Sequence, residues 1–178
     1  MLLKKTISMM AIATTVALFS GCQPPLIDER YLDHGDGTVT DTETNLRWQR
    51  CSVGQTWTGE TCSGEAARLG WKQAMLKAED GWRLPTLKEL NTLVHCSTAR
   101  NPNMDRQNGS LGGQGGGCIG DFDRPTINTS VFPETPPHWY WSSAAYGSGG
   151  RVIGFGSGRF DYWSGDEQLR ARLVRAAD

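Results

Sequence analysis

The positions of five cysteines constrain the fold of this 178-residue chain more than any other feature. Cys22 directly follows an apolar N-terminal segment, and the rest of the chain holds Cys51, Cys62, Cys96 and Cys118. An even set of cysteines in an exported chain predicts two disulfides, for which three connectivities exist. We favour Cys51–Cys62 and Cys96–Cys118, because each pair brackets a segment rich in Gly, Ser and Thr. A zinc site is the alternative, but the chain has no Cys-x-x-Cys pair, which such sites commonly use.

The N-terminal segment has the features of an export signal. Lys4 and Lys5 precede an uncharged run from Ser8 to Phe19, which is too short to span a membrane. The string Leu18-Phe19-Ser20-Gly21-Cys22 resembles the lipobox of bacterial lipoproteins, in which the cysteine carries acyl chains such as palmitate. We therefore expect a lipoprotein signal peptide over residues 1–21 and a lipid anchor at Cys22. The residue after the acylated cysteine is Gln23 rather than Asp, which by analogy with bacterial lipoproteins predicts the outer membrane. An ordinary secretory signal with an incidental cysteine is the alternative.

Composition and charge indicate the class of protein. With 38% hydrophobic and 21% charged residues, the chain has the balance of a globular protein, and its length fits one domain. The formal net charge of -1 argues against a nucleic-acid binder that works through bulk positive charge. We expect a lipid-anchored tether over residues 22–32 and one domain over residues 33–178.

The first half of this domain predicts a hairpin and two helices. Residues 38–41 alternate in polarity, Asn45 marks a turn, and a second extended run ends at Arg50. Apolar residues at helical spacing predict a helix over residues 69–79. A second helix begins at Thr86, because Thr86 and Glu89 form a capping box, and its apolar stripe ends near His95.

The second half predicts a long irregular loop and a strand meander. The loop covers residues 97–137 and contains a glycine-rich string at residues 112–117. Four extended segments follow, at residues 138–143, 151–156, 159–163 and 169–175, separated by turns rich in Gly, Ser and Asp. The fold class is therefore α+β, with two helices packed on antiparallel sheets and a long loop held by a disulfide.

Five blocks in a fixed order resemble a known family. They are residues 36–51, residues 82–90 with the string Trp-Arg-Leu-Pro-Thr-Leu-Lys-Glu-Leu, residues 127–133, residues 141–143, and Arg172-Leu-Val-Arg175. Together they resemble the Lcl C-terminal-like domain, named after the end domain of a collagen-like surface adhesin, over residues 33–176. The resemblance implies a C-type-lectin-like fold, which the formylglycine-generating, sulfatase-modifying proteins share. The chain lacks the Gly-X-Y collagen stalk of the adhesin.

Signatures of catalysis, metal binding and cofactor binding are missing from the sequence. The three histidines, His34, His95 and His138, lie in no nucleophile motif. No stretch matches the reactive cysteine pair of the formylglycine-generating enzymes. The calcium-binding strings of sugar-binding C-type lectins, such as Glu-Pro-Asn, are absent as well. We expect no enzymatic activity, no metal and no cofactor.

Two arginines inside apolar runs, Arg83 and Arg172, are predicted to be structural. A buried guanidinium needs carboxylate or carbonyl partners, and its planar fork can bind several of them at once. Glu89, Asp161 and Asp166 are the candidate carboxylates for such pairs.

The strands near the C-terminus carry the candidate binding residues: Tyr140, Arg151, Arg159 and Trp163. Strand alternation places Tyr140 on the outer face if Trp139 and Trp141 face the core, and it sets Arg159, Asp161 and Trp163 opposite Phe160 and Tyr162. For Trp139, Trp141 and Phe160 we expect core packing. Arg151, Arg159, Arg170 and Arg175 form a candidate basic strip for an anionic glycan.

These features predict a non-catalytic, lipid-anchored envelope protein that binds a surface glycan or a protein partner. Aromatic and arginine side chains are the usual anchors of such surfaces. An accessory subunit of an envelope assembly is the second hypothesis, and an enzyme of the sulfatase-modifying type is the third. No pattern in the sequence indicates the oligomeric state.

Overall fold

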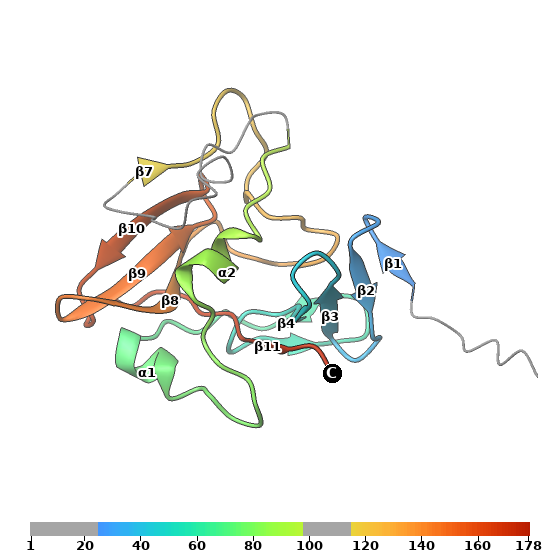
Figure 1. Cartoon of the computed structure of the whole chain (residues 1–178), viewed down its shortest axis with the longest axis horizontal. Helices are drawn as coiled ribbons and strands as arrows, with labels where there is room; N and C mark the ends of the chain where they lie inside the picture. The colour runs from blue at the N-terminus through green and yellow to red at the C-terminus, as the bar shows by residue number, and fades with distance from the viewer. Residues whose placement is uncertain (1–24, 98–114) are drawn as a thin grey trace, which may run out of the picture.

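The computed structural model describes residues 25–97 and 115–178. The expected signal peptide, the expected acylation site Cys22 and residues 112–114 of the glycine-rich string lie outside these residues. Two antiparallel sheets occupy opposite ends of the described molecule, with two short helices beside the second sheet (Figure 1). Within the described residues, no helix has the length and hydropathy needed to cross a membrane.

The first sheet has five strands, in the order β1-β2-β3-β4-β11. Its strands are β1 (Leu26–Ile27), β2 (Tyr31–Asp33), β3 (Thr38–Asp41), β4 (Leu46–Gln49) and β11 (Val174–Ala176). The predicted hairpin is β3–β4, and Asn45 in its turn has a φ of 54°, a left-handed conformation that asparagine tolerates well.

The expected tether is only partly separate from the domain. Strands β1 and β2 form a hairpin on the edge of the first sheet, and the ring of Tyr31 is 4% exposed. Arg30, between these strands, donates two hydrogen bonds to the Asp41 carboxylate, at 2.8 and 2.6 Å. The prediction of a tether up to residue 32 is therefore wrong from Leu26 onward, because these contacts fix the segment to the sheet.

The second sheet has four strands, in the order β7-β10-β9-β8. They are β7 (Gly115–Gly116), β8 (Trp139–Tyr146), β9 (Gly149–Gly154) and β10 (Arg159–Trp163), and β8, β9 and β10 form the predicted meander. A separate two-stranded ribbon consists of β5 (Thr56–Trp57) and β6 (Cys62–Ser63).

The segment at residues 169–175 is not a fourth strand of the meander. Leu169 pairs with Leu69, Arg170 forms a single parallel bridge to Tyr140, and Val174 in β11 pairs with Trp48 in β4. The segment therefore crosses from the second sheet to the first. Its apolar residues are buried because it runs between the two sheets, which local sequence alternation does not distinguish from a meander strand.

The two helices are shorter than predicted. Helix α1 covers only Trp71–Met75, so the expected apolar stripe reaches the core in part: Ala74 is buried and Trp71 packs beside it, whereas Met75 is 40% exposed. Helix α2 covers Leu87–Asn91 and has the predicted capping box, in which the Thr86 hydroxyl accepts a hydrogen bond from the backbone N–H of Glu89. The α+β class is compatible with this architecture, although strands dominate it.

Buried side chains cover both faces of the β8–β9–β10 sheet. On one face Tyr140 and Ile153 pack with Leu90 of α2. On the other face Trp141 and Val152 pack in a second cluster, which includes Ala74 of α1. The middle of this sheet is therefore buried on both sides, and exposed positions occur at the ends of its strands.

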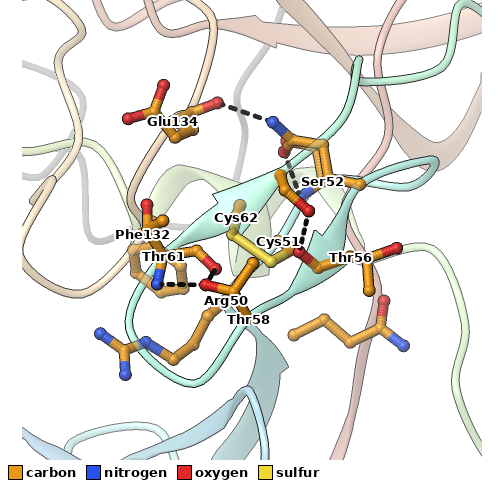
Figure 2. The surroundings of a disulfide bond; sticks show 12 residues. Arg50, Cys51, Ser52, Thr56, Thr58, Thr61, Cys62, Phe132 and Glu134 are labelled. Atoms are coloured by element: carbon orange, nitrogen blue, oxygen red, sulfur yellow. Dashed lines mark hydrogen bonds between the residues drawn. A yellow bond between two sulfur atoms is a disulfide. The ribbon is translucent and has the colours of Figure 1, made fainter.

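Both predicted disulfides are present. Cys51–Cys62 closes a loop with a sequence separation of 11, and Cys96–Cys118 closes one with a separation of 22. Figure 2 shows the first disulfide, which joins Cys51 to Cys62 in β6, with Arg50 and Phe132 near it. Each bond stabilises the fold by about 3 kcal/mol in the chain-entropy model.

The two arginines predicted to be structural are so, with different partners. Arg83 donates two hydrogen bonds to Glu89, both of 2.8 Å, as the sequence suggested. Arg172 is fully buried and donates to backbone carbonyl and hydroxyl oxygens. Neither Asp161 nor Asp166 serves as the suggested partner, since Asp161 accepts a hydrogen bond from the Tyr162 backbone and Asp166 lies at the surface.

The ion pair between Arg30 and Asp41 predicts acid sensitivity. Burial alone raises the pKa of Asp41, but the hydrogen bonds from Arg30 and Thr44 outweigh it and hold the pKa below its ordinary value of 3.8. Since the folded chain binds this proton more weakly than the unfolded chain, the stabilisation is present above about pH 5 and is lost as the pH falls through the folded pKa. We expect Asp41→Asn to lower the free energy of unfolding by about 2 kcal/mol at pH 7, and by less at pH 3.

Urea denaturation at pH 7, 5 and 3 measures this difference. The matched control is Asp121→Asn, which changes an exposed carboxylate and should have little effect at any of the three pH values. A gap between wild type and Asp41→Asn that stays constant down to pH 3 would contradict the assignment.

Candidate functional site

Exposed aromatic side chains gather at the ends of β8 and β10. Tyr146 is 43% exposed, Tyr162 is 38% exposed and Trp163 is 36% exposed, and the half-buried Trp139 contacts Trp163. We call these four residues the aromatic rim. The Tyr146 and Tyr162 rings are stacked, with centroids 4.1 Å apart and planes 28° apart. The Trp139 and Trp163 rings are 6.1 Å apart and tilted by 53°.

Strand register places the two ring pairs on opposite faces of the sheet. Tyr146 lies opposite Gly149 and Tyr162 lies opposite Arg151, so these two rings share a face across β9. The guanidinium of Arg151 lies 5.1 Å from the centre of the Tyr146 ring, within the range of a cation–π contact.

The tryptophan pair depends on glycine in β9. Trp139 lies opposite Gly154 and Trp163 lies opposite Gly150. A Cβ atom on Gly154 would approach the Trp139 ring to 2.8 Å, so only glycine lets this ring lie flat on the strand. Arg159 and Asp161 share this face, and Arg159 is exposed. The face therefore offers flat rings beside a guanidinium and a carboxylate.

Tyr140, one of the predicted binding residues, is not at the surface. It is fully buried, its hydroxyl lies 2.9 Å from the Ser52 hydroxyl, and its ring packs edge-on against Phe155. Burial is the main cause that raises the pKa of Tyr140. The prediction is wrong because both faces of the sheet are covered at this point, so that alternation does not separate core from surface.

The four arginines of the predicted basic strip do not form one surface. Arg170 is buried and its guanidinium donates to the backbone oxygen of Ala66, which removes it from any ligand. Arg175 lies over the Trp82 ring, near Asp178. Arg159 is exposed, but β-strand register places it on the face opposite Arg151. Among the predicted binding residues, Arg159 and Trp163 are the two that are exposed on a common face, whereas Tyr140 shares the face of Arg151 but is buried.

A family model described as the Lcl C-terminal domain matches residues 37–175. The chain belongs to the Lcl C-terminal domain family. The match begins in the turn before β3, so it includes both disulfides and the aromatic rim, whereas the β1–β2 hairpin precedes it. No curated protein and no solved structure matches the chain.

Three rim residues of this Lcl C-terminal domain, Trp139, Tyr146 and Tyr162, were missing from the predicted binding residues, and Trp139 was expected in the core but is only partly buried. Tyr146 lies beyond the predicted end of its strand, because β8 continues to the Gly147 turn. Tyr162 was predicted to share a face with Phe160, which is correct, but only Phe160 lies in the buried cluster that contains Leu90 of α2. Aromatic residues directly before a glycine-rich turn are the signal that would have identified Tyr146.

Groups for metal binding are scattered in this Lcl C-terminal domain. Over residues 25–97 and 115–178, no cluster of three or more His, Cys, Asp or Glu residues is placed to hold a metal ion. His34 lies 2.9 Å from the Thr40 hydroxyl, and the exposed His95 and His138 lie on separate segments.

Proposed function

We propose that this Lcl C-terminal domain is a non-catalytic recognition module that binds a glycan through the aromatic rim. One observation carries the proposal: the exposed aromatic residues Tyr146, Tyr162 and Trp163 gather at the ends of two strands of one sheet. An exposed cluster of large rings is costly in water unless it serves an interaction.

The chemistry of the rim supports a sugar ligand. Flat aromatic faces stack on the apolar faces of sugar rings, and neighbouring polar groups then orient the sugar. On the tryptophan face, Arg159 and Asp161 share the side of the sheet that carries Trp139 and Trp163. Stacking and hydrogen bonding are therefore available side by side.

The pairing of the cysteines supports binding rather than catalysis. An enzyme of the sulfatase-modifying type uses reactive cysteines, whereas Cys51, Cys62, Cys96 and Cys118 all lie in disulfides. A disulfide-bonded cysteine has no thiolate and is not a nucleophile.

The proposal also includes an outer-membrane location and a C-type-lectin-like fold. Acylation at Cys22 would hold the domain at the outer membrane, and this expectation rests on the sequence alone. A C-type-lectin-like fold is supported by the short helices, by the two disulfides and by the pairing of β4 with the C-terminal β11.

A protein partner is the second candidate, with this chain as an accessory subunit of an envelope assembly. Tyrosine, tryptophan and arginine dominate the binding energy of protein interfaces, and the contact of Arg151 with Tyr146 has this character. Co-purification of a stoichiometric partner with the wild type, and its loss from a Tyr146→Ala variant, would favour this candidate.

Glycan-array binding of the full chain in mild detergent tests the main proposal. For each glycan that the wild type binds, we expect Trp163→Ala to bind about tenfold more weakly, because one exposed stacking ring is lost. The matched control is Ile119→Ala, which removes an exposed apolar side chain outside the rim. Equal binding by Trp163→Ala and the wild type would refute a role for the tryptophan face.

A further inference from the structure

A polar hollow of about 410 Å³ lies where the start of α1, the β8–β9 turn and the loop after β10 meet. Its volume is within the usual range of small-molecule sites. The side chains that line it are Lys72, Gln73, Ser148, Asp166 and Gln168. Figure 1 shows α1 beside the same end of the second sheet, away from β1.

Close backbone contacts give the hollow a fixed floor. A Cβ atom on Gly149 would lie 2.0 Å from the backbone oxygen of Trp163, and one on Gly165 would lie 2.6 Å from that of Ser148. The backbone N–H of Trp71 also donates to the Gly165 oxygen at 2.9 Å. Three segments distant in sequence are thus held together, which fixes the positions of the lining residues.

The two amides of the hollow are oriented in complementary directions. The Gln73 oxygen accepts a hydrogen bond from the Gly70 backbone N–H at 3.0 Å, which leaves the NH₂ group of Gln73 for a ligand. The NH₂ group of Gln168 donates to the Asp166 backbone oxygen at 3.2 Å, which leaves the Gln168 oxygen as an acceptor. One amide therefore offers a donor and the other offers an acceptor.

The remaining groups complete a set suited to neighbouring hydroxyls. Lys72 supplies ammonium donors, the Asp166 carboxylate supplies acceptors, and the Ser148 hydroxyl supplies both. Each sugar hydroxyl also donates and accepts. The charges of Lys72 and Asp166 cancel, so the lining does not favour an anion over a neutral ligand.

We infer that the polar hollow binds the terminal unit of a neutral saccharide. The inference rests on the proposed function and extends it, since Trp163 lies two residues before Gly165 of the hollow. A chain of sugars can therefore occupy the hollow with one end and stack on the tryptophan pair with the next units. The lining holds one carboxylate, whereas a calcium site takes six to eight oxygen ligands, so binding in the hollow needs no calcium.

Saturation-transfer NMR on the detergent-solubilised full chain tests the inference. The probes are methyl glycosides of glucose, galactose, mannose and N-acetylglucosamine, and a sulfated monosaccharide serves as the anionic comparison. We expect at least one neutral glycoside to bind, with affinity unchanged by a chelator or by salt between about 50 and 500 mM. We expect Asp166→Asn and Gln73→Ala each to weaken it about tenfold, because each removes a hydrogen bond to the ligand.

The matched control is Glu167→Gln, which changes the exposed carboxylate between Asp166 and Gln168 that does not line the hollow. Binding that Asp166→Asn and Gln73→Ala leave unchanged, or that falls steeply with salt, would overturn the inference. If no monosaccharide binds but larger glycans still bind in a manner that needs Trp163, the hollow is refuted and the proposed function stands. If neither monosaccharides nor larger glycans bind, both are refuted.

Discussion

Replacement of Arg172 by alanine is expected to lower the free energy of unfolding by about 4 kcal/mol or more. This effect should exceed that of any other arginine substitution in the described chain, because Arg172 is fully buried and its guanidinium has four acceptors. Urea denaturation at pH 7 under oxidising conditions measures the change.

The reason lies in the position of Arg172 between the two sheets. Its guanidinium donates to the backbone oxygens of Gln49, at 2.8 Å, and of Arg50. It also donates to the Thr135 hydroxyl at 2.6 Å, and it lies 4.8 Å from the centre of the Phe132 ring. Removal leaves buried oxygens without donors and creates a cavity, and both effects destabilise a fold.

Burial lowers the pKa of Arg172 to about 10, which still leaves the side chain charged at pH 7. Arg172→Met separates the two contributions, because it fills much of the volume but supplies no donors. We expect its loss of stability to lie between those of Arg172→Ala and the wild type.

The control is Arg68→Ala, which changes an exposed arginine and should alter stability by less than about 0.5 kcal/mol. An Arg172→Ala variant as stable as Arg68→Ala would show that the buried hydrogen bonds make no net contribution.

Features that depend on nearby residues were predictable from the sequence. The capping box of Thr86 and Glu89, the turn at Asn45 and both disulfide pairs follow from local spacing, and the structure confirms them. Each of these needs only the geometry of one turn or one closed loop.

Features that depend on distant segments were not predictable. Residues 169–175 alternate like a meander strand, but they run between the sheets because Val174 pairs with Trp48. Tyr140 is buried because Leu90 of the distant helix α2 packs with it, and Arg170 is buried where its segment pairs with the edge of β8. One strand's alternation specifies which residues share a face, but not whether another segment covers that face.

In the candidate site, too, the features that depend on nearby residues were predictable and those that depend on distant segments were not. Strand β10 was predicted with its observed bounds, so Arg159 and Trp163 were assigned correctly to one face. Their exposure could not be predicted from one strand, because it depends on which distant segments pack over the sheet. Trp163 is 36% exposed although the ring of Trp71 in α1 lies against Gly150, its partner in β9.

The second large effect is expected when the Cys51–Cys62 disulfide is removed. The double variant Cys51→Ala/Cys62→Ala should lose about 3 kcal/mol of stability, since the unfolded chain gains the freedom of an open loop. The loss should also be local. Cys62 pairs with Trp57 in the β5–β6 ribbon, and the guanidinium of Arg50 lies 4.3 Å from the centre of the Trp57 ring.

That contact links the disulfide to the buried network. Arg50 donates to Asp33 at 2.9 Å and to the backbone oxygen of Val131 at 2.8 Å, so it ties the first sheet to the segment after Ile127. When the ribbon detaches, Trp57 no longer covers this arginine. We therefore expect a lower urea midpoint and faster hydrogen exchange at the backbone amide of Thr58, which donates a hydrogen bond to the backbone oxygen of Thr61.

Removal of Cys96–Cys118 by the equivalent double alanine variant is the matched comparison. Loop length alone predicts a slightly larger loss for it, because its sequence separation is 22 rather than 11. We expect similar losses in urea, but faster exchange at Thr58 only when Cys51–Cys62 is missing. If the amide of Thr58 stays protected in the Cys51→Ala/Cys62→Ala variant, the packing of Trp57 on Arg50 holds the ribbon without the disulfide, and the predicted coupling is wrong.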